Sequence, residues 1–140
     1  MSIPSDAIQQ AETNTSYYWE RPDRIIVQCI KNGIVQTLQD ARENTETFER
    51  LAGGSKRLIL VDMRAKFSAA PGVREYYAGP EAGRMVLAMA LFSDSAFGRM
   101  IGNLYLTVTP PKFPTRLFTS EPLAVAWLLR AGKEASRTPR

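Results

Sequence analysis

An aspartate and an arginine follow an apolar run in the middle of the chain. Leu58 to Val61 are apolar without alternation, which is typical of a strand buried on both faces of a parallel sheet. Asp62 and Arg64 come at its carboxyl end, where open α/β sheets bind ligands and partners. A carboxylate and a guanidinium could therefore bind a ligand or a partner protein there. Alternatively, Asp62 accepts backbone hydrogen bonds in the following loop and Arg64 is its local ion-pair partner.

Three further polar residues are candidates for the same site. Arg74, Arg99 and Asn103 could converge with Asp62 to hold an anion or a phosphorylated peptide, since guanidinium groups bind such anions well. The alternative is that these arginines are scattered over a solvated surface. The candidates for partner or anion binding are thus Asp62, Arg64, Arg74, Arg99 and Asn103.

Two absences from the composition narrow the possible reactions. The sequence has no histidine, which excludes Ser-His and Cys-His nucleophile activation and removes the commonest transition-metal ligand. Cys29 is the single cysteine, so an internal disulfide is excluded and a structural zinc site is disfavoured. It lies in an apolar strand pattern, which indicates a core position. We find no complete catalytic set, and we predict a protein that is not an enzyme and needs no cofactor or metal.

Charge and hydropathy bear on nucleic-acid binding, membrane spanning and localisation. Most of the net charge of +4 comes from isolated arginines in the second half of the sequence. Nucleic-acid binding usually needs a basic stripe with interleaved aromatic residues, so this pattern disfavours it. The densest apolar run, residues 85–92, is far shorter than the ~20 residues that span a bilayer. The first residues lack a secretory pattern, and we expect a cytoplasmic protein.

The first half of the sequence predicts a hairpin and a strand-helix-strand unit. Aromatic and β-branched residues at 17–19 and 25–30 flank a turn around Pro22, which predicts a β-hairpin. A helical apolar period runs from Thr37, a capping residue, to Ala52, and Gly53-Gly54 ends it. The central strand follows at once, so the two strands flanking this helix should be parallel.

The second half alternates between helical and extended patterns. One predicted helix places Phe97, Met100, Ile101, Leu104, Tyr105 and Val108 on a single face, with Ser93-Asp94-Ser95 as its cap. Another begins after Ser120 and ends at Gly132. The remaining elements are a short helix at 73–77, a buried strand at 85–92 and an edge strand at 115–119. The order β-β-α-β-α-β-α-β-α indicates an α/β fold with a single mixed, mostly parallel sheet.

This series of motifs resembles the STAS domain, the fold of bacterial anti-sigma-factor antagonists. It is similar to small bacterial STAS-like proteins in three central pieces, 61–64, 74–77 and 88–93, and in three later ones, 99–103, 111–118 and 126–128. The resemblance implies a phosphorylatable serine in an Asp-Ser pair after the central strand. Residues 64–72 lack that pair, and Ser68, outside the matching register, is the only hydroxyl and the only candidate phosphoacceptor.

The resemblance implies a non-enzymatic regulatory module that binds a protein partner or a second copy of itself. The alternative is a small-ligand or lipid-binding protein, because STAS-like folds resemble the CRAL-TRIO domain. An adaptable apolar cavity could then be lined by Met85, Met89, Phe92, Phe97 and Met100. We expect a mobile leader at residues 1–15, the STAS-like domain at 16–132 and a basic tail at 133–140.

Overall fold

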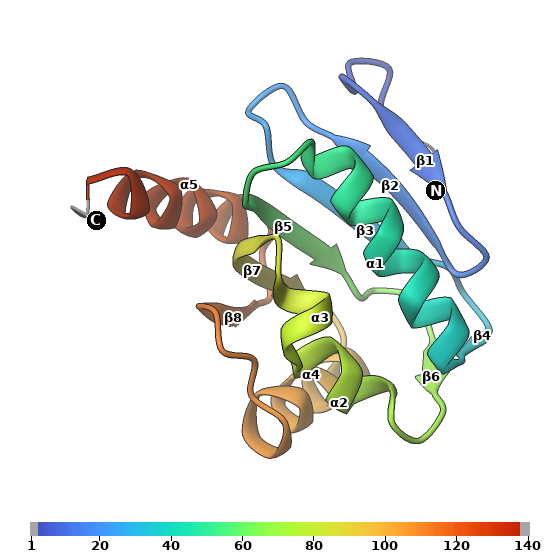
Figure 1. Cartoon of the computed structure of the whole chain (residues 1–140). Helices are drawn as coiled ribbons and strands as arrows, with labels where there is room; N and C mark the ends of the chain where they lie inside the picture. Colours follow the sequence, from blue (N-terminus) through green and yellow to red (C-terminus); the bar gives the residue numbers. More distant parts are fainter. Residues whose placement is uncertain (1–2, 138–140) are drawn as a thin grey trace.

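Six strands form one sheet that positions the rest of the chain (Figure 1). The structure, a computed structural model, describes residues 3–137. The strand order is β1-β2-β3-β5-β7-β8, antiparallel from β1 to β3 and parallel from β3 to β8. The strands are β1 (Gln10–Glu12), β2 (Ser16–Glu20), β3 (Ile26–Ile30), β5 (Arg57–Asp62), β7 (Val86–Phe92) and β8 (Thr115–Phe118). The mixed, mostly parallel sheet predicted from the sequence is confirmed.

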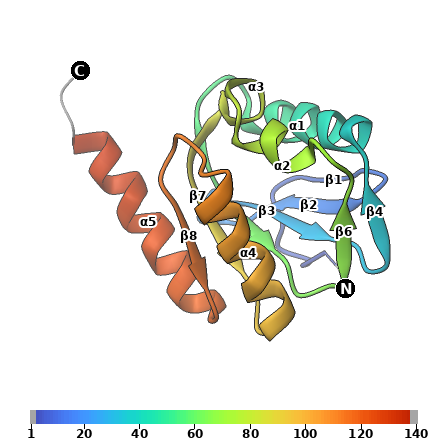
Figure 2. The same ribbon diagram turned by 90° about the horizontal axis from the view of Figure 1, so that it is seen from below.

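Helices cover both faces of this sheet. One face carries four helices: α1 (Leu38–Ala52), α2 (Val73–Ala78), α3 (Pro80–Gly83) and α4 (Ala96–Val108). The opposite face carries α5 (Glu121–Arg137). Figure 2 shows α5 on the side of the sheet away from α1 and α2. Since side chains alternate along a strand, Ile59 and Val61 pack into the core beneath α1, whereas Leu60 packs into the core beneath α5.

Local sequence signals explain where α1 begins and ends. The Thr37 hydroxyl accepts a hydrogen bond from the Asp40 backbone N–H at 3.1 Å, and the Asp40 carboxylate accepts one from the Thr37 N–H at 2.9 Å. This is the reciprocal capping box that the sequence predicts. Gly53 ends the helix in the left-handed conformation, with φ of 69°, which a residue without a β-carbon adopts at no steric expense.

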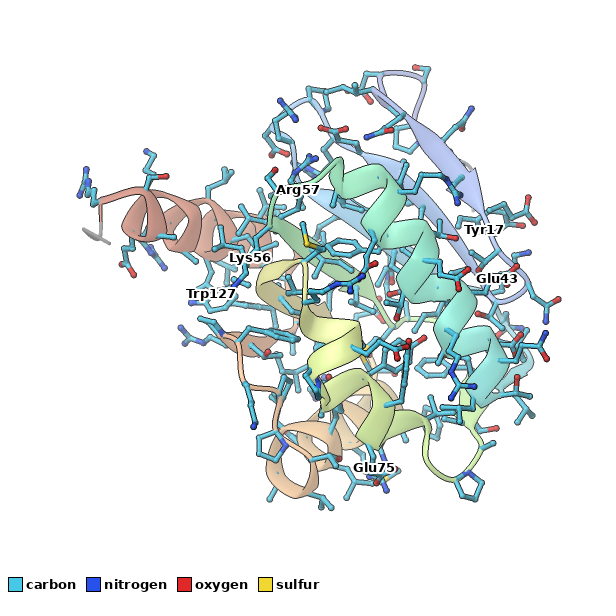
Figure 3. The ribbon with its side chains drawn as sticks, viewed as in Figure 1. Tyr17, Glu43, Lys56, Arg57, Glu75 and Trp127 are labelled. Atoms are coloured by element: carbon cyan, nitrogen blue, oxygen red, sulfur yellow. The ribbon has the colours of Figure 1, made fainter. Side chains whose placement is uncertain are left out.

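A buried ion pair links β2 to β5 across β3. Arg57, at the amino end of β5 (Figure 3), donates to the Glu20 carboxylate at 2.7 Å and to the Arg24 carbonyl at 2.6 Å. Burial opposes ionisation of Glu20, but hydrogen bonds from Gln9, Arg57 and Arg24 outweigh it and lower the pKa of this carboxyl. The pair therefore depends on all of its partners, because neither charge has access to bulk water.

Two short strands that lie outside the main sheet were not predicted. β4 (Ile34–Gln36) and β6 (Phe67–Ala69) form a separate parallel pair, extended at its ends by hydrogen bonds from Gly33 N–H to the Lys66 carbonyl at 2.7 Å and from Ala70 N–H to the Gln36 carbonyl at 2.8 Å. Each has three residues and no clear alternation, which leaves too little pattern for a sequence-based prediction. The pair holds the loop after β5, including Ser68, against the segment that leads into α1.

The ordered fold extends beyond both predicted ends of the domain. Residues 10–12 of the expected leader form β1, which pairs with residues 17–19. At the other end, α5 continues through Gly132 to Arg137, because an isolated glycine is tolerated in a helix and its missing β-carbon lets Leu58 approach closely. Residues 1–2 and 138–140 of the predicted leader and tail lie outside the described residues. Within residues 3–137, no helix has the length and apolarity needed to span a bilayer.

The apolar face predicted for α4 is only partly buried: Tyr105 lies in the core and Ile101 packs against it. Gly98, Gly102 and Tyr105 are the buried residues of this helix, whereas Met100 and Val108 are more than half exposed. The two glycines allow a close approach to the sheet: a β-carbon at Gly102 would lie 3.0 Å from the Leu117 side chain. Small residues rather than large apolar ones therefore set the packing of α4.

Candidate functional site

A cavity of about 440 Å³ lies between the sheet, α2 and α4. This volume falls in the range of roughly 300–1,000 Å³ that small-molecule sites occupy. Its floor lies near the carboxyl ends of the parallel strands, where Val61 of β5 and Met63, just after the end of that strand, both line the cavity. The apolar walls come from strands and helices alike, including Ile30, Leu91, Val73 and Ile101.

The cavity opens to solvent between β6 and α4. Ser68 and Ala69 of β6 and Phe97 and Leu104 of α4 line it and are themselves exposed. A molecule can therefore enter without unfolding of the surrounding elements. The opening places the candidate phosphoacceptor Ser68 at the rim of the cavity.

Two residues of the cavity lining each have a buried polar atom for which the described residues offer no hydrogen-bond partner. Within residues 3–137, four buried side-chain polar atoms lack a hydrogen-bond partner, and two of them, Arg74 Nη1 and Tyr105 Oη, belong to residues that line the cavity. A buried unsatisfied donor typically costs about 1–3 kcal/mol of stability. Burial raises the pKa of Tyr105, so its phenol is a neutral donor at physiological pH. Both atoms are covered by neighbouring protein atoms, so neither faces the open space of the cavity.

Two other polar residues of the cavity lining, Tyr77 and Gln36, are paired with each other. The Tyr77 hydroxyl donates to the Gln36 side chain and accepts from Asn44 Nδ2 at 3.0 Å. Asn44 also donates to the Thr15 hydroxyl at 3.0 Å, and it accepts from the Thr13 hydroxyl at 2.6 Å. This network links α2 to α1 and to the turn between β1 and β2, and it supports one wall of the cavity.

Asp62 and Arg64 lie together, outside the cavity. Arg64 donates through Nε to Asp62 Oδ1 at 3.0 Å and through Nη2 to Oδ2 at 2.8 Å, and the Arg64 backbone N–H donates to Oδ1 at 3.1 Å. The guanidinium lies over the Phe92 ring, 4.9 Å from its centroid. Because Asp62 follows Val61 on the strand, its side chain points to the α5 face. This geometry is that of a loop-organising carboxylate with a local ion pair.

The five predicted site residues occupy three separate places. Arg74 lines the cavity, whereas Arg99 and Asn103 are exposed on α4 and do not line it. Glu75, the exposed neighbour of Arg74 on α2, lies at the outer edge of the molecule (Figure 3). The five residues therefore do not surround one pocket. Among residues 3–137, no three acidic or cysteine side chains gather as metal ligands.

The sequence located the apolar lining only in part. Of the residues proposed for an apolar cavity, Met89 and Phe97 line it. Phe92 packs on the opposite face with the α5 core, and Met100 points to solvent. Tyr105, which the sequence placed on an apolar helical face without a functional role, supplies an unpartnered hydroxyl instead.

Comparisons with known proteins identify the family and the fold. Residues 18–131 match a family described as a domain of unknown function (DUF7793), and the chain belongs to this family. No match is found among curated proteins. A crystal structure of an uncharacterized protein from the DUF3478 family of Shewanella loihica PV-4, with a SpoIIAA-like fold, is similar at a TM-score of 0.52 and 15% identity, covering 91% of this chain and 98% of that one. The STAS-like fold predicted from the sequence is confirmed.

Proposed function

We propose that this DUF7793 protein binds a small apolar molecule in the cavity between α2, α4 and the sheet. The observation that carries the proposal is the cavity itself: about 440 Å³, lined mostly by apolar side chains and open to solvent. Water forms few hydrogen bonds in such a space because few polar groups line it. An apolar ligand that replaces this water is stabilised by the apolar surface that it buries. Met63 and Met89 in the lining can adapt to ligands of different shape.

The proposal is tested by a neutral fluorescent probe and a variant that fills the cavity. N-phenyl-1-naphthylamine, which is apolar and uncharged, should bind the purified chain with saturation at about one probe per chain. Ile101→Trp places an indole in the cavity and should abolish this binding. Asn103→Trp adds the same ring on the exposed side of the same helix and should leave binding unchanged.

A second blocking variant guards against misfolding. Leu104 is exposed at the rim, so Leu104→Trp narrows the opening with little risk to the core. Loss of probe binding in both blocking variants, with normal thermal unfolding of Leu104→Trp, supports the cavity as the binding site. Probe binding that survives in both variants, or that never occurs in the wild type, contradicts the proposal.

A second candidate function is self-association as a protein-interaction module, which the sequence suggested first. The observation that favours it is an exposed apolar stripe on α4 formed by Phe97, Met100, Leu104 and Val108. Exposed apolar residues that gather on one surface often mark interaction sites. Light scattering after size-exclusion chromatography should then show a dimer that dissociates in Met100→Glu. A wild-type monomer at every concentration rules self-association out.

A further inference from the structure

We infer that the ligand of this cavity is an uncharged molecule with a carbonyl oxygen, which accepts a hydrogen bond from the side-chain amide of Gln36. The inference rests on the proposed function, because it names the chemical class of the molecule that occupies the same cavity. The ligand is then an apolar ketone or ester rather than a hydrocarbon or a fatty acid.

The first observation is a free donor on a side chain that is almost completely buried. Gln36 ends β4, is 3% exposed and lines the cavity. Its Oε1 atom accepts from the Tyr77 hydroxyl, whereas its Nε2 atom donates to no group in residues 3–137. Nor is Nε2 among the unpartnered polar atoms of these residues that neighbouring protein atoms cover. This N–H group therefore keeps contact with open space, and the open space that Gln36 borders is the cavity.

The orientation of the Gln36 amide follows from a chain of hydrogen bonds that starts at the backbone. The Thr13 hydroxyl oxygen accepts from the backbone N–H groups of Ser16 at 3.0 Å and Thr15 at 3.3 Å. Both of its lone pairs are then occupied, so this hydroxyl can only donate to Asn44, whose Oδ1 atom lies 2.6 Å away. An amide side chain keeps nearly the same shape when it is turned by 180°, and this bond decides between the two orientations of Asn44.

Asn44 passes this direction on to Tyr77 and Gln36. Asn44 Nδ2 donates to the Tyr77 hydroxyl at 3.0 Å, so the single proton of that hydroxyl goes to Gln36 Oε1. Burial raises the pKa of the Tyr77 phenol, which therefore keeps this proton at neutral pH. With Oε1 held by Tyr77, the Nε2 donor of Gln36 is the free end of the chain. Hydrogen bonds in such a chain polarise one another, which strengthens the terminal donor.

A neutral donor at this depth favours an uncharged acceptor. A ligand oxygen that bonds to Gln36 leaves bulk water, because Gln36 is 3% exposed. Removing an ionised carboxylate from water costs far more than one neutral N–H group returns, whereas a carbonyl oxygen exchanges one hydrogen bond for another. Arg74 is the one charged residue of the lining among residues 3–137, and its Nη1 atom is covered by protein. An anionic ligand is the alternative that the experiment must exclude.

The test compares three ligands that share a naphthalene ring. 2-Acetylnaphthalene carries a carbonyl, 2-isopropenylnaphthalene has nearly the same shape with a CH₂ group in place of the oxygen, and 2-naphthoate carries a carboxylate. Each is used to displace N-phenyl-1-naphthylamine from the wild type, Gln36→Met and Gln39→Met. Gln39 is exposed near the start of α1 and does not line the cavity, so Gln39→Met is the matched control.

The measured quantity is the ratio of the dissociation constants of the alkene and the ketone for the same protein. In the wild type the alkene leaves the Gln36 N–H group without a partner, and in Gln36→Met the ketone has no donor. The ratio should therefore fall by at least about fivefold in Gln36→Met and keep its wild-type value in Gln39→Met. Changes in folding or cavity shape affect both ligands and largely cancel. 2-Naphthoate should bind the wild type more weakly than the ketone.

A measurement on the wild type protects the test against a variant that fails to fold. The infrared stretching frequency of the carbonyl in bound 2-acetylnaphthalene should be lower than in hexane, because a hydrogen bond weakens the C=O bond. An unshifted frequency would overturn the inference, whatever the behaviour of Gln36→Met.

The outcomes separate this inference from the proposed function. If the probe binds the wild type and the ratio is unchanged in Gln36→Met, the cavity remains a ligand site and the carbonyl assignment is wrong. If 2-naphthoate binds the wild type more tightly than the ketone, the ligand is anionic and the assignment is again wrong. If the probe does not bind the wild type, the proposed function itself fails.

Discussion

Gly98 on α4 offers a sharp test of how closely this helix approaches the sheet. A β-carbon at this position would lie 2.7 Å from the Ser93 β-carbon, 1.9 Å from the Ser93 hydroxyl oxygen and 3.2 Å from the Met63 carbonyl oxygen. Ordinary carbon–carbon contacts lie at about 3.5–4.0 Å. Ser93 is fully buried, and its backbone N–H donates to the Phe118 carbonyl at 3.1 Å, so it has little freedom to move.

The expected magnitude follows from two opposing effects. Replacing glycine by alanine in a helix stabilises it by up to about 1 kcal/mol, whereas overpacking a tight contact costs about 1–3 kcal/mol. At Gly98 the contact involves a short, buried side chain and a backbone carbonyl, so we expect Gly98→Ala to lower the free energy of unfolding by about 1–2 kcal/mol. Displacement of α4 should also weaken probe binding, because this helix forms one wall of the cavity.

Gly132→Ala on α5 is the matched control. Its β-carbon would meet the end of the Leu58 side chain at 3.2 Å, and a flexible leucine can rotate away. The helix-propensity gain should therefore dominate, and the variant should be neutral or stabilised by up to about 1 kcal/mol. Urea unfolding followed by the fluorescence of the two tryptophans measures both changes. Equal stabilisation by the two substitutions would refute the close packing of α4 at Gly98.

Two further substitutions and one labelling experiment test other parts of the structure. Glu20→Gln leaves Arg57 buried without its carboxylate and should cost about 3–5 kcal/mol near neutral pH. Because folding lowers the pKa of Glu20, its ionised carboxylate stabilises the folded chain above the unfolded pKa near ~4.3, and this stabilisation is lost as the pH falls through the folded pKa. Urea unfolding at a series of acid pH values should therefore show a weaker dependence of the free energy of unfolding on pH in Glu20→Gln. An unchanged pH dependence would contradict this role of Glu20. Burial first, and then the charge of Asp62, raises the pKa of Cys29 to about 11, so a thiol reagent at mildly alkaline pH should react slowly until the chain unfolds; rapid labelling of the folded chain would disprove this. Asn44→Ala removes hydrogen bonds to three buried or half-buried side chains and should lower the unfolding free energy by about 3 kcal/mol, measured against exposed Asn103→Ala; a loss no larger than that of the control would argue against the network.

The elements with strong local signals were predictable from the sequence. The capping box at Thr37, the stop at Gly53 and the four-residue apolar run of the central strand each specify their structure within a few residues. The extent of α5 was not predictable from Gly132 alone. In the structure Gly132 lies inside the helix and against Leu58, which is 74 residues away in the sequence, so this contact is known only once the fold is known.

The candidate site was predictable only in its general place. The carboxyl end of the central strand is near the cavity, as expected for this fold class. Side chains alternate along a strand, which puts Val61 on the cavity side and Asp62 on the opposite side. Asp62, the strongest candidate in the sequence, therefore lies away from the cavity. Arg74 and Tyr105 both line the cavity, which depends on how α2 and α4 pack against the sheet and cannot be seen in the sequence.

The most direct test of the proposed ligand site is a calorimetric titration of N-phenyl-1-naphthylamine into the full chain. We expect saturable binding of about one probe molecule per chain in the wild type, with the negative heat-capacity change that accompanies burial of apolar surface. Ile101→Trp should abolish this binding, and Asn103→Trp should retain it. Absence of binding in the wild type, or equal binding in Ile101→Trp, would contradict the assignment of this cavity as the binding site.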